Sequence, residues 1–217
     1  MPPYNCLAGQ RSWSQVDESI PVVLASASPR RFELLNRIGI LPTVAAADLD
    51  ESQRDGEPPE QYVARIALEK ALRVAPNFLD SAVLAADTAV VLNHKVFGKP
   101  ANQTEAKAML EELAGRTHCV MTAVAVIAPT PQHPAQQTPR TQYVTLETAQ
   151  VTMIAADPSE LDWYVSTLEP MDKAGSYAVQ GMGAALVERV EGDPTTVIGL
   201  PLRASIRLLH LAGVHWP

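Results

Sequence analysis

Hydrophobic and polar positions follow two different spacings along the chain. Continuous apolar runs such as PVVLAS at 21–26 and SAVLAADTAVVL at 81–92 are typical of strands buried in a sheet. Residues 29–38 and 59–75 instead repeat apolar side chains at helical spacing, and both stretches start with a proline. This alternation of strands and helices predicts an α/β protein.

The second half of the chain adds a predicted antiparallel hairpin. HCVMTAVAVIA at 118–128 and the alternating run QYVTLETAQVTMI at 142–154 flank residues 129–141, which are rich in Pro, Gln and Thr and are expected to form an exposed loop. The other predicted elements are strands at 43–46, within 93–100 and at 184–190, and helices at 104–114, 158–167 and 202–212. We expect residues 1–21 to be a disordered leader and residues 22–217 to form one domain, with two lobes flanking a deep cleft.

The composition is that of an ordinary globular protein with an acidic balance. Of the 217 residues, 47% are hydrophobic and 19% are charged, and the formal net charge is −7. This charge argues against nucleic acid as a partner, because sequence-independent binding of nucleic acid requires a basic surface. No apolar run is long enough to span a membrane, and residues 1–20 lack the apolar centre of a secretory signal. We therefore expect a cytoplasmic protein with neither a nucleic-acid nor a membrane partner.

Two charged residues interrupt stretches that are otherwise apolar. Lys70 lies on the inward face of the predicted helix 59–75, where it must extend to solvent, pair with a carboxylate or face a cleft. Asp87 lies inside the predicted strand 81–92, where an unpaired carboxylate would be unfavourable. It is either a buried aspartate satisfied by backbone donors or a carboxylate at a cleft. At a cleft it is able to bind a divalent metal or to accept a proton from water.

The segment LASASPRRFELL combines a helix start with two arginines. Ser28, followed by proline, is a good N-cap, and the free N–H groups of such a helix start favour a phosphate. Arg30 and Arg31 oppose the helix dipole in the first turn, so helix capping does not explain them. Together with Lys70 and Lys99, these arginines would form a cationic cage for a polyphosphate.

Two further features would complete such a pocket. Glu51 and Asp87 are carboxylates that could hold a metal ion bridging the polyphosphate. The segment DKAGSYAVQGMGA at 172–184 contains three glycines that permit close backbone approach, and its polar residues include Gln180. It matches neither the phosphate loop nor the dinucleotide fingerprint, so a purely structural glycine loop remains an open interpretation.

Four segments resemble, in order, the signature segments of the Maf family of nucleoside triphosphate pyrophosphatases. They are LASASPRRFELL, AADTAVVLNHKVFGKP, THCVMTAVAV and DKAGSYAVQGMGAALVERVEGDPTTVIGLPL, and the resemblance covers residues 22–211. It implies an α/β fold similar to that of the inosine triphosphate pyrophosphatases, with a curved mixed sheet. It also implies hydrolysis of a nucleoside triphosphate to the monophosphate and pyrophosphate, with a divalent metal cation such as Mg²⁺ or Mn²⁺.

The resemblance assigns roles to individual residues. Asp87 matches the family's proposed proton acceptor, and five further residues match other site positions: Ser26, Arg31, Glu51, Lys70 and Lys99. From their chemistry, we expect Ser26, Arg31, Lys70 and Lys99 to bind the triphosphate, and Glu51 with Asp87 to hold the metal ion.

Three more positions indicate a branch of the family. Arg30, Thr88 and Gln180 match the branch that acts on dTTP and UTP, whereas the branch that acts on 7-methyl-GTP has tryptophan, glutamine and glutamate there. The implied substrates are dTTP and UTP, with modified pyrimidine nucleotides as a further class, and the nucleotide is the expected partner. A nucleotide-sensing regulatory protein acting in septum formation is the alternative, and a purine-repair pyrophosphatase that prefers ITP or XTP is a third. A homodimer is compatible with the sequence.

Overall fold

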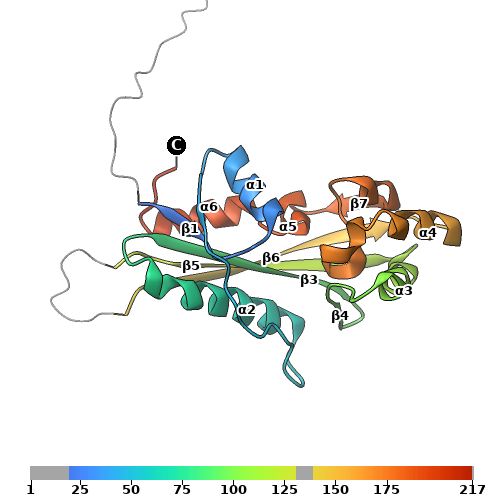
Figure 1. The fold of residues 1–217 in the computed structure, drawn as a ribbon, viewed down its shortest axis with the longest axis horizontal. Coiled ribbons are helices and arrows are strands. Elements are labelled where there is room, and N and C mark those ends of the chain that lie inside the picture. Colours follow the sequence, from blue (N-terminus) through green and yellow to red (C-terminus); the bar gives the residue numbers. More distant parts are fainter. Residues whose placement is uncertain (1–19, 131–138, 217) are drawn as a thin grey trace, which may run out of the picture.

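The computed structural model describes residues 20–130 and 139–216, which are arranged around a mixed sheet (Figure 1). In the described residues this sheet has seven strands in the order β2-β1-β3-β5-β6-β7, and β4 pairs with β3 outside this path. The strands are β1 (Val22–Leu24), β2 (Thr43–Val44), β3 (Ala82–Leu92), β4 (Lys95–Phe97), β5 (Thr117–Ile127), β6 (Gln142–Met153) and β7 (Val187–Glu191). β1 runs parallel to β2 and β3, whereas the β3–β4, β3–β5, β5–β6 and β6–β7 pairs are antiparallel. The predicted α/β class and the β5–β6 hairpin are thus confirmed.

The helices start where local sequence favours a start. They are α1 (Pro29–Arg37), α2 (Pro59–Val74), α3 (Gln103–Leu113), α4 (Pro158–Ser166), α5 (Pro194–Ile198) and α6 (Leu202–Leu211), with the 3₁₀ helices η1 (Ala75–Asn77), η2 (Glu169–Asp172), η3 (Ala174–Ser176) and η4 (Met182–Leu186). At α4, Asp157 accepts from the Glu160 N–H while the Glu160 carboxylate accepts from the Asp157 N–H, which forms a capping box. Ser28 precedes α1 as expected, but its side chain makes no capping hydrogen bond to the described residues.

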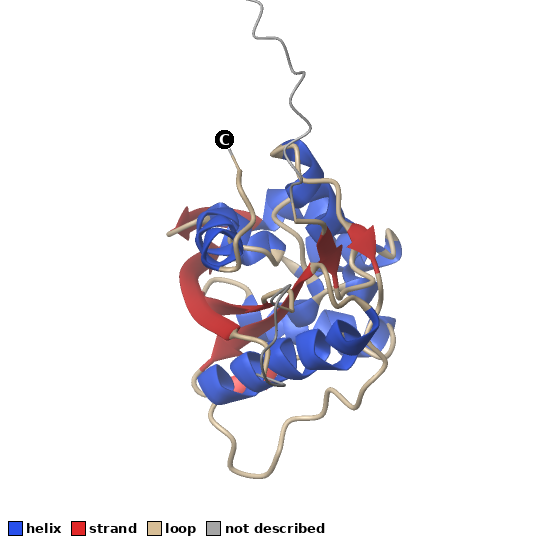
Figure 2. Ribbon diagram, turned by 90° about the vertical axis from the view of Figure 1, so that its left-hand side faces the viewer, coloured by secondary structure: helices blue, strands red, loops and turns tan. Residues whose placement is uncertain are grey.

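The two faces of the sheet pack against different helices (Figures 1 and 2). Alternation along β3 places Leu84 and Ala86 in the cluster with α1 and α6, and Val83 and Ala85 in the cluster with α2. A third apolar cluster packs α3 and α4 against the other end of the long strands. Figure 2 shows that the long strands curve, as the family resemblance implies.

The largest differences from the sequence prediction lie near the C-terminus. The strand predicted at 184–190 begins only at Val187, because residues 182–186 form η4. The sequence did not predict α5, because five residues are too few to display a helical period. Most of the predicted leader 1–21 and of the loop 129–141 lies outside the described residues, and the division into two lobes stays a prediction. Within the described residues, no helix combines the length and the apolar character needed to cross a membrane.

Candidate active site

A cavity of about 670 Å³ lies beside one edge of β3. On this edge, β3 pairs with β1 at residues 82–84 and with β4 at residues 90–92. Residues 85–89 therefore have no strand partner on this side among the described residues. The chain that leaves β1 turns into α1 next to this gap, so that the turn and the middle of β3 line the same cavity.

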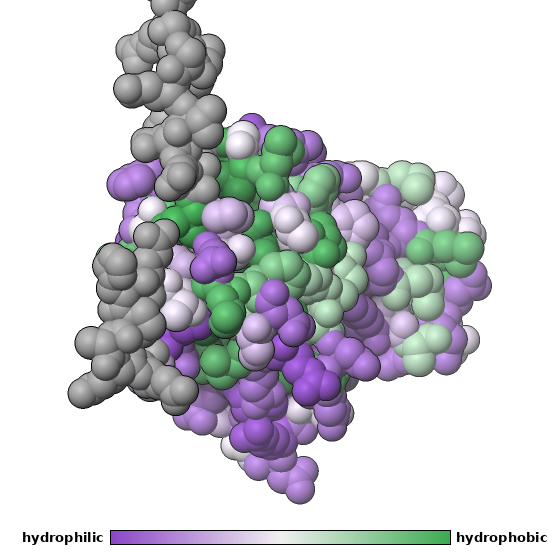
Figure 3. Space-filling model, turned by 60° about the vertical axis from the view of Figure 1, so that its left-hand side comes forward, coloured by the Kyte–Doolittle hydropathy of each residue, from purple (hydrophilic) through white to green (hydrophobic). Residues whose placement is uncertain are grey.

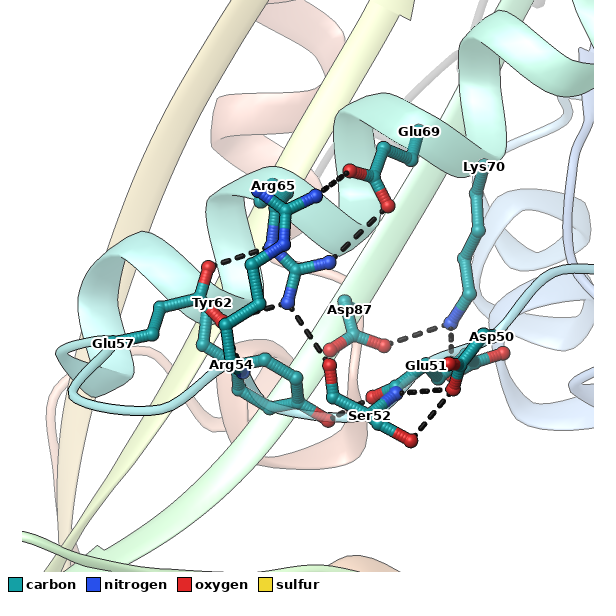
Figure 4. Close-up of polar contacts among 10 residues, drawn as sticks. All are labelled: Asp50, Glu51, Ser52, Arg54, Glu57, Tyr62, Arg65, Glu69, Lys70 and Asp87. Atoms are coloured by element: carbon teal, nitrogen blue, oxygen red, sulfur yellow. Dashed lines mark hydrogen bonds and ion pairs between the residues drawn. The ribbon is translucent and has the colours of Figure 1, made fainter.

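Lys70 joins two carboxylates at the cavity wall (Figure 4). Its Nζ atom donates to Asp87 Oδ1 at 2.8 Å and to Glu51 Oε2 at 2.6 Å. The side chains of Lys70 and Asp87 are only 9% and 10% exposed, whereas that of Glu51 is 47% exposed. The sequence left open whether Lys70 pairs with a carboxylate or faces a cleft, and in the structure it does both.

Burial makes the Asp87 carboxyl a weaker acid. Its removal from water raises the pKa of Asp87 above the ordinary value, while the positive charges of Lys70 and Arg31 act in the opposite direction. A carboxylate with a raised pKa holds a proton more strongly, which suits a group that accepts a proton from water. Because Asp87 lines the cavity, a ligand there is able to reach it.

Arg31 is held by three hydrogen bonds at another part of the wall. Its Nε atom donates to the Gly199 carbonyl at 2.8 Å, its Nη1 atom to Ser26 Oγ at 3.2 Å and its Nη2 atom to Thr88 Oγ1 at 3.2 Å. The Thr88 hydroxyl is also hydrogen-bonded to Thr122 Oγ1 at 2.9 Å. The structure thus brings the predicted site residues Ser26, Arg31 and Thr88 together. The side chains of Ser26 and Thr88 both contact the Arg31 guanidinium.

The two neighbouring arginines occupy separate positions. Arg30 donates from Nη1 to Asp172 Oδ2 at 2.6 Å and from Nη2 to the Asp172 carbonyl at 3.4 Å. Lys99, in the turn after β4, is exposed and lines the cavity. All four cations of the predicted cage therefore line one cavity. Arg30 is paired with Asp172, and Lys70 contacts both Asp87 and Glu51. Arg31 and Lys99 form no ion pair with the described residues, so they are the cations most available to a phosphate chain.

Gln180 also lines the cavity, from the segment between η3 and η4. The next residue, Gly181, has a φ of +109°, in the region that side-chain-bearing residues rarely adopt. The backbone conformation at Gly181 therefore explains why this segment contains a glycine there. The same turn places Gln180, a predicted site residue, at the cavity.

A comparison with known protein families shows which family the chain belongs to. A family model described as Maf-like protein matches residues 21–212. The chain belongs to the Maf family. The matched range includes every predicted site residue, and the resemblance inferred from four short segments is confirmed.

Several relatives within the Maf family carry the name dTTP/UTP pyrophosphatase. One from Myxococcus xanthus is 47% identical over 196 residues, covering 90% of this chain and 94% of the relative. Another from Methylobacillus flagellatus is 43% identical over 198 residues, again covering 90% of this chain and 94% of the relative. Among solved structures, a HAM1 protein from Coxiella burnetii matches with a TM-score of 0.47 and 14% identity, covering 88% of this chain and 99% of that chain.

Two cavity side chains that contact predicted site residues, Tyr62 and Asp172, were not themselves assigned to the site from the sequence. The Tyr62 hydroxyl donates to the Glu51 carbonyl at 2.9 Å. Because Tyr62 lies two helical turns before Lys70 on the same face of α2, helical spacing was a signal that could have placed it in the site. Asp172 gave no comparable signal, since it contacts Arg30 across 142 positions of the chain.

The segment that carries Glu51 is fastened to α2 by Arg65 (Figure 4). The Nε and Nη2 atoms of Arg65 donate to the two carboxylate oxygens of Glu57, both at 2.6 Å, and Nη2 also donates to the Ser52 carbonyl at 3.0 Å. This segment projects below α2 in Figure 1, and Figure 3 shows the projection as hydrophilic. These contacts add to those of Lys70 and Tyr62 with Glu51 itself, and together they limit the motion of an exposed polar segment.

Glu51 and Asp87 are the carboxylates that meet at Lys70, and they are the best candidates for holding a metal ion. Among residues 20–130 and 139–216 there is no group of three or more His, Cys, Asp or Glu side chains that could hold one alone. Mg²⁺ is commonly bound by one or two carboxylates together with the phosphates of a substrate. The two carboxylates therefore fit a metal ion that is also coordinated by the phosphate oxygens of a substrate.

Proposed function

We propose that this protein is a nucleoside triphosphate pyrophosphatase that hydrolyses dTTP and UTP to the monophosphate and pyrophosphate. The observation that carries the proposal is the contact of Lys70 with Asp87 in a cavity that Arg31 also lines. It places a buried carboxylate among the cations that a triphosphate requires. The names of the two bacterial relatives support the choice of substrates. Modified pyrimidine nucleotides are a further substrate class, and the expected location is the cytoplasm.

Binding of the triphosphate depends on cations held in fixed positions. Arg31 and Lys99 supply positive charge to the phosphates, and Ser26 helps to hold the Arg31 guanidinium in place. Lys70 orients the triphosphate and keeps the Asp87 carboxylate in position. Positive charge that is already in place stabilises the negative charge that develops as the bond between the α- and β-phosphates breaks.

Asp87 activates the attacking water. It accepts a proton as the water oxygen bonds to the α-phosphorus, and the bond from that phosphorus to the bridging oxygen breaks, so that pyrophosphate leaves.

A divalent cation, Mg²⁺ or Mn²⁺, would be held by Glu51 and Asp87 together with phosphate oxygens. When bound, it neutralises part of the triphosphate charge and polarises the reacting phosphate. The chain's contribution is to orient these ligands. Lys70 contacts both carboxylates, and Tyr62 holds the Glu51 backbone.

Arg30, Thr88 and Gln180 select the base. All three line the cavity, and Arg30 and Gln180 present side chains that are able to form hydrogen bonds with a base edge. A site of this kind rejects a base that leaves its polar groups unpaired. The proposed selection of pyrimidines rests on this discrimination.

Pyrophosphate release across a panel of nucleotides, with and without divalent metal, tests the proposed activity. We expect metal-dependent, multiple-turnover hydrolysis of dTTP and UTP. A preference for 7-methyl-GTP, ITP or XTP would contradict the pyrimidine assignment. Binding without turnover would instead favour the nucleotide-sensing regulatory protein.

The role of Asp87 is tested by Asp87→Asn, which removes the proton acceptor with little change of shape. We expect hydrolysis of dTTP to fall by about 10²–10⁴, the contribution typical of a positioned proton acceptor. Asp80→Asn, at an exposed position just before the same strand, is the matched control. Near-normal hydrolysis by a folded Asp87→Asn protein would contradict the assignment.

A further inference from the structure

A short 3₁₀ helix, η2, contacts both segments that carry the flexible base-selecting side chains. Its first residue, Glu169, contacts the turn that follows Gln180. Its last residue, Asp172, contacts Arg30. Neither acidic residue has a role in the proposed hydrolysis.

The Glu169 carboxylate accepts three hydrogen bonds. Its Oε1 atom accepts from the Gly183 N–H at 2.9 Å and from the Tyr164 hydroxyl at 3.0 Å. Its Oε2 atom accepts from the Met182 N–H at 3.0 Å. Two of these donors belong to the backbone just after Gln180, so a single carboxylate holds that turn.

The Tyr164 hydroxyl extends this contact to the other side of Gln180. While it donates to Glu169, it accepts from the Ala178 N–H at 3.2 Å. Tyr164 is fully buried, so packing determines where its hydroxyl lies. The backbone after Gln180 is therefore anchored to the Glu169 carboxylate directly, and the backbone before Gln180 is anchored to it through Tyr164.

The turn packs so closely on these groups that two of its positions have no room for a side chain. A Cβ atom at Gly181 would lie 2.6 Å from Glu169 Oε2, and one at Gly183 would lie 2.5 Å from Tyr164 Oη. Although burial opposes it, the N–H groups of Gly183 and Met182 hold the pKa of the Glu169 carboxyl below its ordinary value. An ionised carboxylate binds such donors more strongly than a neutral group does.

Asp172 holds Arg30 by a comparable arrangement. Its Oδ2 atom accepts from Arg30 Nη1 at 2.6 Å, and its Oδ1 atom accepts from Lys173 Nζ at 2.6 Å. Lys173 Nζ also donates to the Glu169 carbonyl at 2.6 Å, which ties the two ends of η2 together. The Arg30–Asp172 pair is partly exposed and contributes little to folding stability, so its main effect is on the direction of the guanidinium.

We propose that Glu169 and Asp172 are positioning residues for base selection, with Glu169 placing Gln180 and Asp172 placing Arg30. This inference rests on the proposed function, because it takes Gln180 and Arg30 as the groups that contact the base. Hydrogen-bond selection requires correct geometry, so a mobile Gln180 or Arg30 would bind right and wrong bases with similar affinity. None of the hydrogen bonds that Glu169 and Asp172 form, as described above, involves a phosphate-binding residue. Replacing either acidic residue should therefore affect turnover less than base selectivity.

The test compares kcat/KM for dTTP with that for GTP in Glu169→Gln and Asp172→Asn. We expect the dTTP-to-GTP ratio to fall about tenfold in each variant, mainly through a higher KM for dTTP and with kcat nearly unchanged. Asp162→Asn is the control, because it removes an exposed carboxylate on the adjacent α4 that pairs with Lys107 away from the cavity. It should leave the ratio unchanged.

Double variants separate positioning from a general loss of structure. If Asp172 acts through Arg30, Asp172→Asn should have no further effect on the ratio in an Arg30→Ala background. Glu169→Gln should likewise have no further effect in a Gln180→Ala background. Additive losses would show that the acidic residues act by another route and would overturn the inference.

The outcomes distinguish this inference from the proposed function. If Arg30→Ala and Gln180→Ala lower the ratio but Asp172→Asn and Glu169→Gln do not, only the inference fails. If Arg30→Ala and Gln180→Ala leave the ratio unchanged, the proposed base selection fails and the inference fails with it. Should Glu169→Gln not fold, the exposed Asp172→Asn still tests the placing of Arg30. Tyr164→Phe, which removes the hydroxyl that links the Ala178 N–H to Glu169, then tests the placing of Gln180, and an unchanged ratio in this variant would overturn that half of the inference.

Discussion

Asp87 and Thr88 are adjacent on β3, yet their side chains contact different helices on opposite sides of the sheet. Asp87 accepts from Lys70 of α2, and Thr88 accepts from Arg31 of α1. Strand alternation requires this divergence. One cavity reaches both residues because the edge of β3 between its contacts with β1 and β4 has no strand partner among the described residues. The gap in the sheet therefore lets groups from both faces act on one ligand.

Replacing Lys70 with methionine should affect both stability and activity. The Lys70→Met variant leaves the buried Asp87 carboxylate without its partner, and breaking such a pair costs about 3–5 kcal/mol of unfolding free energy. Hydrolysis should fall by about 10²–10³. Urea unfolding and pyrophosphate release measure the two effects.

A second substitution checks the cause of that destabilisation. Adding Asp87→Leu to Lys70→Met removes the uncompensated charge, so the double variant should be more stable than Lys70→Met while remaining inactive. A double variant that is less stable than the single one would contradict the charge-pair explanation.

Arg31→Lys keeps the positive charge but cannot reproduce the three hydrogen bonds of the guanidinium. We expect kcat/KM for dTTP to fall by about 10². Arg37→Lys, at an exposed position near the end of the same helix, is the control. Unchanged kinetics in a folded Arg31→Lys protein would show that charge alone is sufficient at this position.

Arg65→Lys should weaken metal binding without touching the cavity. Lysine cannot bridge both oxygens of Glu57 and the Ser52 carbonyl, so the segment that carries Glu51 becomes more mobile. The Mg²⁺ concentration for half-maximal activity should rise about tenfold, as is typical when residues behind metal ligands are replaced. Arg73→Lys, exposed on the same helix, should leave it unchanged. Equal metal requirements for both variants would refute the role of Arg65.

His118 should make stability depend on pH. Burial lowers the pKa of His118 from 6.5 to about 4 in the folded protein, where its Nε2 atom lies 2.7 Å from the Tyr177 hydroxyl. Below pH 6.5 the unfolded chain therefore binds a proton that the folded protein does not, and stability falls as the pH is lowered toward 4. The loss is about 3 kcal/mol in total.

The variant His118→Gln isolates this contribution. Relative to wild type it should lose about 3 kcal/mol less unfolding free energy between pH 7 and pH 4. His210→Gln, at an exposed position, should follow the wild-type curve. Parallel curves for wild type and His118→Gln would contradict the prediction.

Much of the fold was predictable because strand and helix periods are properties of neighbouring residues. The strand β3 occupies almost the whole of its predicted range, and α2 ends one residue before its prediction. The start of β7 was misplaced, since the apolar residues before Val187 pack in a 3₁₀ helix rather than in the sheet. Packing of that kind depends on partners that lie far away in the chain.

The amino-acid order was sufficient to identify the unusual groups of the site, because Lys70 and Asp87 are charges within apolar stretches and such charges require partners. It was not sufficient to say which partners they have. That Arg30 pairs with Asp172 follows from strand register and from chain segments 142 positions apart meeting at one cavity. No local period records such a meeting, because it is created only when the sheet and its helices pack together.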